Sequence, residues 1–178
     1  FLVRANEVGA ITRQEAVSMI PPLLLDVKPH HRVLDMCAAP GSKTFQLLEM
    51  LHARAADDAV SETGSVPSGV VVANDASLQR ANLLTHQTKR SNSPAHIVTN
   101  HQAQKFPFLR ESEACQNEAR ETAYRFDRVL ADVPCSGDGT LRKSPDLWKK
   151  WSPASGVDLH TLQLEIATHA ARLLKVGG

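Results

Sequence analysis

Two stretches of this chain carry side chains whose types and spacing could do chemistry. The first spans residues 33–44, where a short apolar run meets a turn of small residues, Cys37, Ala38, Ala39, Pro40 and Gly41. The second, Asp132-Val133-Pro134-Cys135, places a carboxylate and a thiol three positions apart. Small residues let a ligand approach the backbone, and an ionised thiol is a strong nucleophile. The sequence therefore indicates a ligand-binding turn and a candidate reactive cysteine.

The first stretch is predicted to form a strand, a loop and a helix. Residues 33–36 suit a buried strand, Pro40 and Gly41 interrupt it, and the apolar spacing in residues 43–51 is nearly helical. Backbone amides at a helix N-terminus bind anionic or polar groups, and Lys43 would neutralise such a group. A free carboxylate, such as the methionine end of S-adenosylmethionine, fits this loop. A Rossmann-like turn without a ligand is the plain alternative.

Two familiar phosphate-binding loops are excluded at this turn. A P-loop requires G-x-x-x-x-G-K-[ST], but Met36 stands where its first Gly belongs, and Ser42 separates Gly41 from Lys43. The dinucleotide fingerprint G-x-G-x-x-G is also absent from the turn.

The strand patterns alternate with helical patterns along the chain. Further strands are predicted at residues 69–74, 95–100 and 126–132, and helices at residues 77–90 and 157–174. This order predicts an α/β fold, a parallel sheet with helices on both faces. The polar segments 55–68 and 105–124 are expected to be an exposed loop and a solvated connection.

Polar or small residues follow each predicted strand. Gly41, Asp75, Gln102 and Asp132 all fall at such strand ends, so we expect them to converge on one crevice. A carboxylate after the second strand can accept two hydrogen bonds from a ribose diol, which is the role predicted for Asp75. Capping of the following helix is the alternative for this residue.

The two motifs resemble those of the S-adenosylmethionine-dependent RNA (cytosine-5) methyltransferases. The similarity covers residues 35–44 and 132–140 and extends over nearly the whole chain; residues 13–23 and 148–151 are most similar to the branch that methylates tRNA. The resemblance implies a Rossmann-like class I methyltransferase with S-adenosyl-L-methionine as cofactor. It departs at Gln102, where the family carries an Asp that accepts from the adenine amino group. A Gln carbonyl can accept the same bond without charge, so we expect weaker adenine recognition.

The resemblance also implies roles for the second motif. The family uses two cysteines, and the attacking one belongs to a later T-C-S motif, expected beyond Gly178. By position, Cys135 is the helper that promotes breakdown of the covalent adduct, and Asp132 contacts the cytosine or the cofactor. A buried structural thiol is the alternative for Cys135. Cys37 is expected to pack within the cofactor turn, and Cys115 to be incidental.

A basic segment with two tryptophans follows the second motif. Arg142, Lys143, Lys149 and Lys150 could contact RNA phosphates, and exposed indoles of Trp148 and Trp151 could stack on unpaired bases. The alternative is that the tryptophans are anchored in the core under a solvated basic face.

Composition limits the class of protein. With 178 residues, 42% of them hydrophobic, the chain can form one core, and a net charge of +1 restricts RNA binding to a local surface. Two of the three cysteines lie inside motifs, which favours a reducing compartment. We expect an intracellular protein of the nucleus or nucleolus, with the cytoplasm as the alternative. No apolar run could span a membrane, and neither a metal site nor a protein partner is predicted.

These observations predict one catalytic domain. Residues 1–30 are expected to form its N-terminal helical segment, with a helix at residues 13–20 that Thr12 caps and that Pro21 and Pro22 end. Residues 31–178 are expected to form the methyltransferase domain, without its last strands. The predicted activity is methylation of cytosine carbon 5 in RNA, with tRNA as the substrate. A DNA cytosine-5 enzyme with Cys135 as nucleophile and a non-catalytic module that binds cofactor and RNA are the alternatives.

Overall fold

A four-stranded parallel sheet forms the centre of the molecule. The computed structural model describes residues 1–53, 66–110 and 123–178. The strands are β1 (Arg32–Asp35), β2 (Val70–Asn74), β3 (His96–Thr99) and β6 (Arg128–Leu130). They lie in the order β3-β2-β1-β6, and Val33 of β1 is level with Val71 of β2 and Arg128 of β6. The predicted parallel sheet is confirmed.

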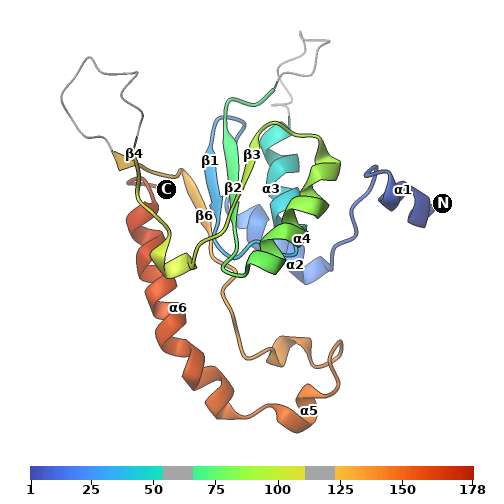
Figure 1. Ribbon diagram of the computed structural model, residues 1–178, viewed down its shortest axis with the longest axis vertical. Coiled ribbons are helices and arrows are strands. Elements are labelled where there is room, and N and C mark those ends of the chain that lie inside the picture. Colours follow the sequence, from blue (N-terminus) through green and yellow to red (C-terminus); the bar gives the residue numbers. More distant parts are fainter. Residues whose placement is uncertain (54–65, 111–122) are drawn as a thin grey trace.

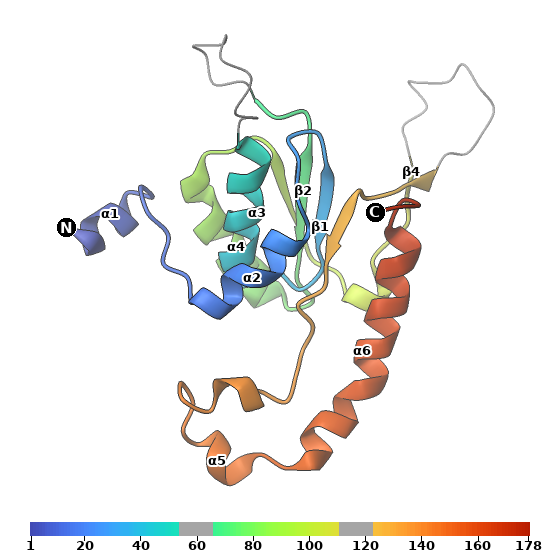
Figure 2. The same ribbon diagram turned by 180° about the vertical axis from the view of Figure 1, so that it is seen from behind.

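Helices cover both faces of this sheet (Figures 1 and 2). One face carries α3 (Ser42–His52) and α4 (Leu78–Thr88), and the other carries the long helix α6 (Pro153–Leu173). The short helix α2 (Ala16–Leu24) packs against α3, while α1 (Leu2–Glu7) lies further out near the N-terminus. A turn of helix, α5 (Leu147–Lys150), precedes α6.

The periodic apolar residues of these helices form the core. Leu47, Leu48 and Leu51 of α3 pack with Val33 and Val71 on one side of the sheet. On the other side, the buried face of α6 packs against β1 and β6 through Ile166, Ala170 and Leu173. The spacing that predicted a helix over residues 157–174 therefore also identified its buried face.

The start of the chain differs from the prediction. The second helix begins at Ala16 and runs through both prolines to Leu24, and Glu15, not Thr12, is its N-cap residue. Pro22 has no N–H to donate to the carbonyl of Ser18, four residues earlier. The side-chain amide of Gln14 donates to that carbonyl instead, at 3.0 Å. A side chain thus satisfies the carbonyl that Pro22 leaves free.

Smaller differences concern the connections. The sequence did not predict the antiparallel pair β4 (Leu109–Arg110) and β5 (Ala123–Tyr124), which lies within the segment expected to be a solvated connection. The fourth sheet strand is three residues long, shorter than the predicted range 126–132. Most of the predicted exposed loop at residues 55–68 and Cys115 lie outside the described residues.

Candidate functional site

The loop after β1 turns at a glycine that packs against α4. Gly41 has φ +110°, and a Cβ placed on it would lie 2.9 Å from Cδ1 of Leu84 in α4. A side chain at this position would therefore be strained and crowded. Ala38 and Ala39 are buried, so the loop packs closely on the edge of the sheet where the strands end.

Asp75 connects this loop to the end of β2. Its carboxylate accepts from the amide of Ala39 at 3.3 Å and from the amide of Ser77 at 3.0 Å. Arg80 lies 3.5 Å from the same carboxylate and donates to the carbonyl of Ala39. Asp75 thus holds the loop against the start of α4, but the capping alternative is wrong, because the N-cap residue of α4 is Ser77, whose hydroxyl accepts from the amide of Arg80. The ribose contact stays a prediction, and a diol would share the carboxylate with Arg80.

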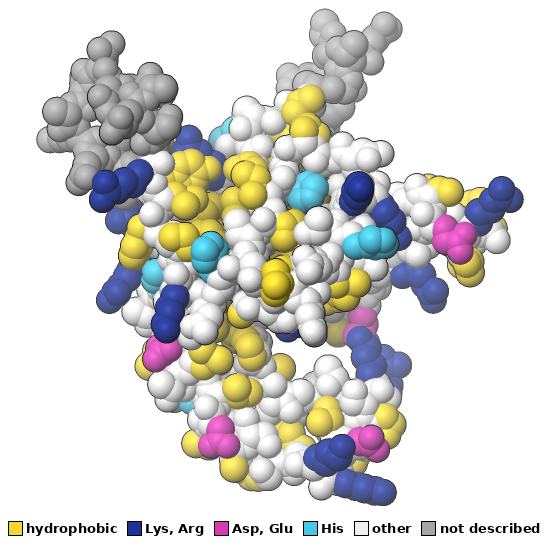
Figure 3. All heavy atoms as spheres, viewed as in Figure 1, with side chains coloured by type: hydrophobic (Ala, Val, Ile, Leu, Met, Phe, Trp, Pro, Cys, Tyr) yellow, Lys and Arg dark blue, Asp and Glu magenta, His cyan; other side chains and the backbone are white. Residues whose placement is uncertain are grey.

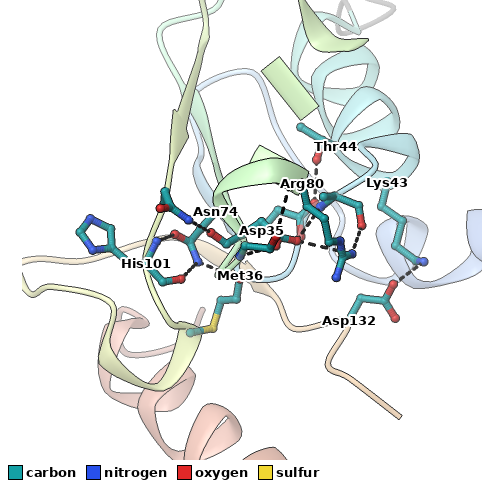
Figure 4. A network of polar contacts seen from close by, with 12 residues as sticks. Asp35, Met36, Lys43, Thr44, Asn74, Arg80, His101 and Asp132 are labelled. Atoms are coloured by element: carbon teal, nitrogen blue, oxygen red, sulfur yellow. Dashed lines mark hydrogen bonds and ion pairs between the residues drawn. The ribbon is translucent and has the colours of Figure 1, made fainter. Parts of the chain in front are cut away.

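A fully buried asparagine joins the ends of three strands (Figure 4). The side-chain amide of Asn74 donates to the carbonyls of Met36 and His101, at 3.0 and 2.8 Å. Its carbonyl oxygen accepts from the hydroxyl of Thr99 and from the amide of His101. All four hydrogen-bonding positions of this amide are used, so Asn74 sets the spacing between the loop after β1 and the loop after β3. The sequence analysis missed this residue.

Asp35, the last residue of β1, is a buried carboxylate. One oxygen accepts from the hydroxyl of Thr44 at 2.8 Å, and the other has no hydrogen-bond partner among the described residues. Removal from water is the main cause that raises the pKa of Asp35 to about 7. Near neutral pH, this carboxyl group takes up or releases a proton directly beneath the loop.

An ion pair brings the two predicted motifs together. The Nζ atom of Lys43, in the first turn of α3, lies 2.7 Å from a carboxylate oxygen of Asp132, which follows β6 (Figure 4). These residues are 89 positions apart in the chain. The predicted convergence of the two motifs is therefore observed.

The cysteines of the two motifs lie in different surroundings. Burial, helped by nearby carboxylates, raises the pKa of the Cys37 thiol to about 11, so that this thiol stays neutral and packs against the core. Cys135 is exposed, and the alternative of a buried structural thiol is therefore wrong for this residue. Gln102 is exposed at the end of β3. Its side chain is not among the hydrogen-bond partners of Asn74.

The basic segment after Cys135 is divided between two roles. Arg142 and Lys143 both form ion pairs with Glu15, which comes directly before α2. Lys149 and Lys150 are exposed, and so are Trp148 and Trp151. The alternative that anchored both tryptophans in the core is wrong, because this segment projects away from the sheet (Figure 1).

Neither a metal site nor a membrane-spanning helix is found in the described part of the chain. No cluster of His, Cys, Asp and Glu side chains within it could hold a metal ion. None of its helices has the length and apolar character needed to cross a bilayer.

The sheet order, the loop after β1 and the motif after β6 together define a Rossmann-like methyltransferase domain. The crystal structure of NSun6 from Pyrococcus horikoshii with SFG has this fold; it superposes with a TM-score of 0.74 at 23% identity, over 98% of this chain and 38% of that one. The model of the family described as 16S rRNA methyltransferase RsmB/F matches residues 22–178, and the chain belongs to this family.

Two curated relatives match over the whole length of the chain. The multisite-specific tRNA:(cytosine-C(5))-methyltransferase of Saccharomyces cerevisiae is 53% identical over 178 residues, which are 24% of the yeast protein. The tRNA (cytosine(34)-C(5))-methyltransferase of Drosophila melanogaster is 50% identical over 178 residues, 23% of its length. The chain thus spans about a quarter of each of these relatives. The resemblance deduced from the motifs is confirmed.

Proposed function

We propose that this chain is the cofactor-binding part of an enzyme that transfers a methyl group from S-adenosyl-L-methionine to carbon 5 of cytosine in RNA, with tRNA as the substrate. The ion pair between Lys43 and Asp132 carries the proposal, because it joins the turn expected to hold the cofactor to the motif expected to meet the cytosine. Family membership and the two tRNA methyltransferases at 53% and 50% identity support it.

The residues around the loop fit this cofactor. Gly41 allows the left-handed turn at which the loop packs against Leu84, and the backbone amides of Gly41, Ser42 and Lys43 lie at the start of α3. The unpartnered oxygen of Asp35 is a buried acceptor beneath the loop. Asp75 and the exposed Gln102 would hold the ribose and the adenine. When bound, the cofactor supplies an electrophilic methyl group.

The motif after β6 serves the base. Lys43 holds the carboxylate of Asp132 in place, so that this carboxylate can orient a cytosine at the carboxyl edge of the sheet. The amide of Gln163 in α6 donates to the carbonyl of Pro134 at 2.8 Å and fixes the chain next to Cys135. Carbon 5 of cytosine becomes nucleophilic only after a thiolate adds to carbon 6. In the proposed division of work, Cys135 promotes breakdown of that adduct, and a cysteine beyond Gly178 forms it.

The same proposal covers substrate binding and location. Arg142, Lys143, Lys149 and Lys150 lie on the segment that follows the motif. Lys149 and Lys150 would contact RNA phosphates, while Arg142 and Lys143, the other two residues predicted to do so, hold this segment to Glu15. An intracellular location, in the nucleus or nucleolus, completes the proposal.

Methyl transfer by the intact protein tests this function. Unmodified tRNA is incubated with isotopically labelled S-adenosylmethionine, and its nucleosides are then identified by mass spectrometry. We expect label in 5-methylcytidine with the wild-type protein. Cofactor binding without any methyl transfer would favour the non-catalytic module and overturn the proposal.

Variants at Cys135 distinguish the RNA enzyme from the DNA alternative. Cys135→Ala is expected to stop turnover while a covalent protein–RNA adduct accumulates, because adduct formation uses the other cysteine. A wild-type adduct with fluorocytosine DNA that disappears in Cys135→Ala would instead identify Cys135 as the nucleophile of a DNA enzyme.

A further inference from the structure

The segment between Cys135 and α6 forms an arm, residues 136–151, that projects from the carboxyl edge of the sheet (Figures 1 and 2). It leaves the sheet directly after the motif with Asp132 and Cys135, and it returns to the body as α6. In Figure 3 an opening separates the arm from the body of the molecule. A strand that places a base near Cys135 therefore passes close to the arm.

Two of the arm's four cations attach it to the rest of the molecule. Arg142 lies 2.9 Å from one carboxylate oxygen of Glu15, and Lys143 contacts the other. The hydrogen bond from Lys143 is the main cause that lowers the pKa of Glu15. Next to Glu15, the side-chain amide of Gln14 donates to Gln46 of α3 at 3.0 Å, so the arm is connected to the helix that starts at the cofactor loop.

The outer end of the arm combines exposed indoles with cations that are not used in this attachment. Trp148 is 72% exposed and Trp151 is 41% exposed. Trp148 lies in α5, and Trp151 follows the last residue of that helix in an extended conformation. Lys149 and Lys150 stand between them and form no ion pair with any described residue. Figure 3 shows Lys and Arg side chains gathered along the arm beside hydrophobic ones.

This combination selects one kind of ligand. A large aromatic side chain left in water forfeits the free energy of its burial, so a pair of exposed indoles on a projecting arm is a surface for binding. The acidic residues of the arm, Asp138 and Asp146, are fewer than its cations, and the cations beside the indoles favour a polyanion over an apolar protein face. Bases of a single strand present the flat faces that stack on indoles, whereas a duplex hides those faces.

We infer that the arm is a binding site for unpaired RNA, in which Trp148 and Trp151 stack on bases next to the target cytosine and Lys149 and Lys150 contact the flanking phosphates. This inference rests on the proposed function, since it names the form of RNA that the site takes. A cytosine must leave its stack to reach the cofactor. The arm holds the neighbouring bases of the strand after that separation.

Binding of two RNA probes by the intact protein tests the inference. The first probe is a fluorescein-labelled single-stranded RNA of mixed sequence, and the second is the same strand annealed to its complement. Trp148→Ala is expected to weaken binding of the single strand about tenfold. Its effect on the duplex is expected to stay within about twofold, because paired bases cannot stack on the indole. Trp148→Phe, which keeps an aromatic face, is expected to restore most of the affinity.

Two further variants separate stacking from charge and from general surface effects. Val157 is also 72% exposed, at the start of α6, and Val157→Ala is the matched truncation that should leave both affinities unchanged. Lys149→Ala is expected to make the dependence of log affinity on log salt shallower by about 0.7. Equal binding of the single strand by wild type and Trp148→Ala, or equal losses on both probes, would overturn the inference. Since binding is measured without methyl transfer, a wild-type protein that binds RNA but transfers no methyl group would contradict the proposed function alone.

Discussion

The buried carboxyl group of Asp35 makes a prediction about stability that does not depend on any ligand. Its pKa is about 7 in the folded chain and near 3.8 when unfolded. When folding raises the pKa of a carboxyl group, the group costs no stability at a pH below its pKa in the unfolded chain. The cost grows as the pH rises from that value toward the pKa in the folded chain. Asp35→Asn cannot ionise, keeps a similar shape and removes this cost. The variant should therefore be more stable than wild type near neutral pH.

The size of the effect follows from the shift. Between about pH 5 and about pH 7, each unit contributes at most about 1.4 kcal/mol and less near the folded pKa, so the advantage of Asp35→Asn in free energy of unfolding should grow by about 2 kcal/mol over this range. For a domain of this size, that corresponds to a difference in Tm that widens by about 4–8 °C. Thermal unfolding of the ligand-free intact protein at several pH values measures it.

Asp127 provides a control of opposite sign. Burial alone would raise the pKa of Asp127, but hydrogen bonds from Lys175 and the amide of Arg32 outweigh it, and the net shift is downward. The stability that this carboxylate contributes is present above its unfolded pKa and is lost as the pH falls, so Asp127→Asn should destabilise the protein near neutral pH and much less in acid. A Tm difference between Asp35→Asn and wild type that stays constant from about pH 5 to about pH 7 would refute the reasoning for Asp35.

Three further substitutions test the site. Asn74→Ala leaves two carbonyls, a hydroxyl and an amide without partners, and it should lower the free energy of unfolding by about 3–5 kcal/mol, measured by denaturant titration. Gly41→Ala should cost about 1–2 kcal/mol and weaken binding of S-adenosylhomocysteine in calorimetry, whereas Gly139→Ala, where a Cβ meets nothing within 4 Å, should do neither. Lys43→Met breaks the ion pair with Asp132, and methyl transfer by the intact protein should fall about a hundredfold while Tm changes little. Unchanged transfer by this variant would separate Lys43 from the reaction.

The strands and helices could be predicted because their apolar periodicity is itself the cause of burial. Residues 33–36 and 69–74 are continuous apolar runs, and they became the two central strands β1 and β2. Since parallel strands end at one edge, the positions of Asp75 and Asp132 at that edge followed from the order of the elements alone. The ion pair of Lys43 with Asp132 is a consequence of this topology.

Other features depended on contacts between distant residues, which no local pattern shows. Asn74 looked like the polar end of a strand, because its four partner groups lie in two distant segments of the chain, at Met36 and at residues 99–101. The prolines of α2 predicted a helix end, yet the helix runs through them, and Gln14 replaces the donor that Pro22 lacks. The ion pairs of Glu15 with Arg142 and Lys143 could not be predicted, because Glu15 lies 127 or more positions before them in the chain. The exposure of Trp148 likewise depends on where the arm leaves the sheet.

The location of the cofactor is the central claim, and a crystal structure of the intact protein soaked with sinefungin tests it most directly. The account predicts density for the analogue against the loop residues 37–43, between Asp75 and Asp132, with its amino acid end toward the start of α3. Density bound elsewhere on the protein, with this loop left uncontacted in a fully soaked crystal, would contradict it.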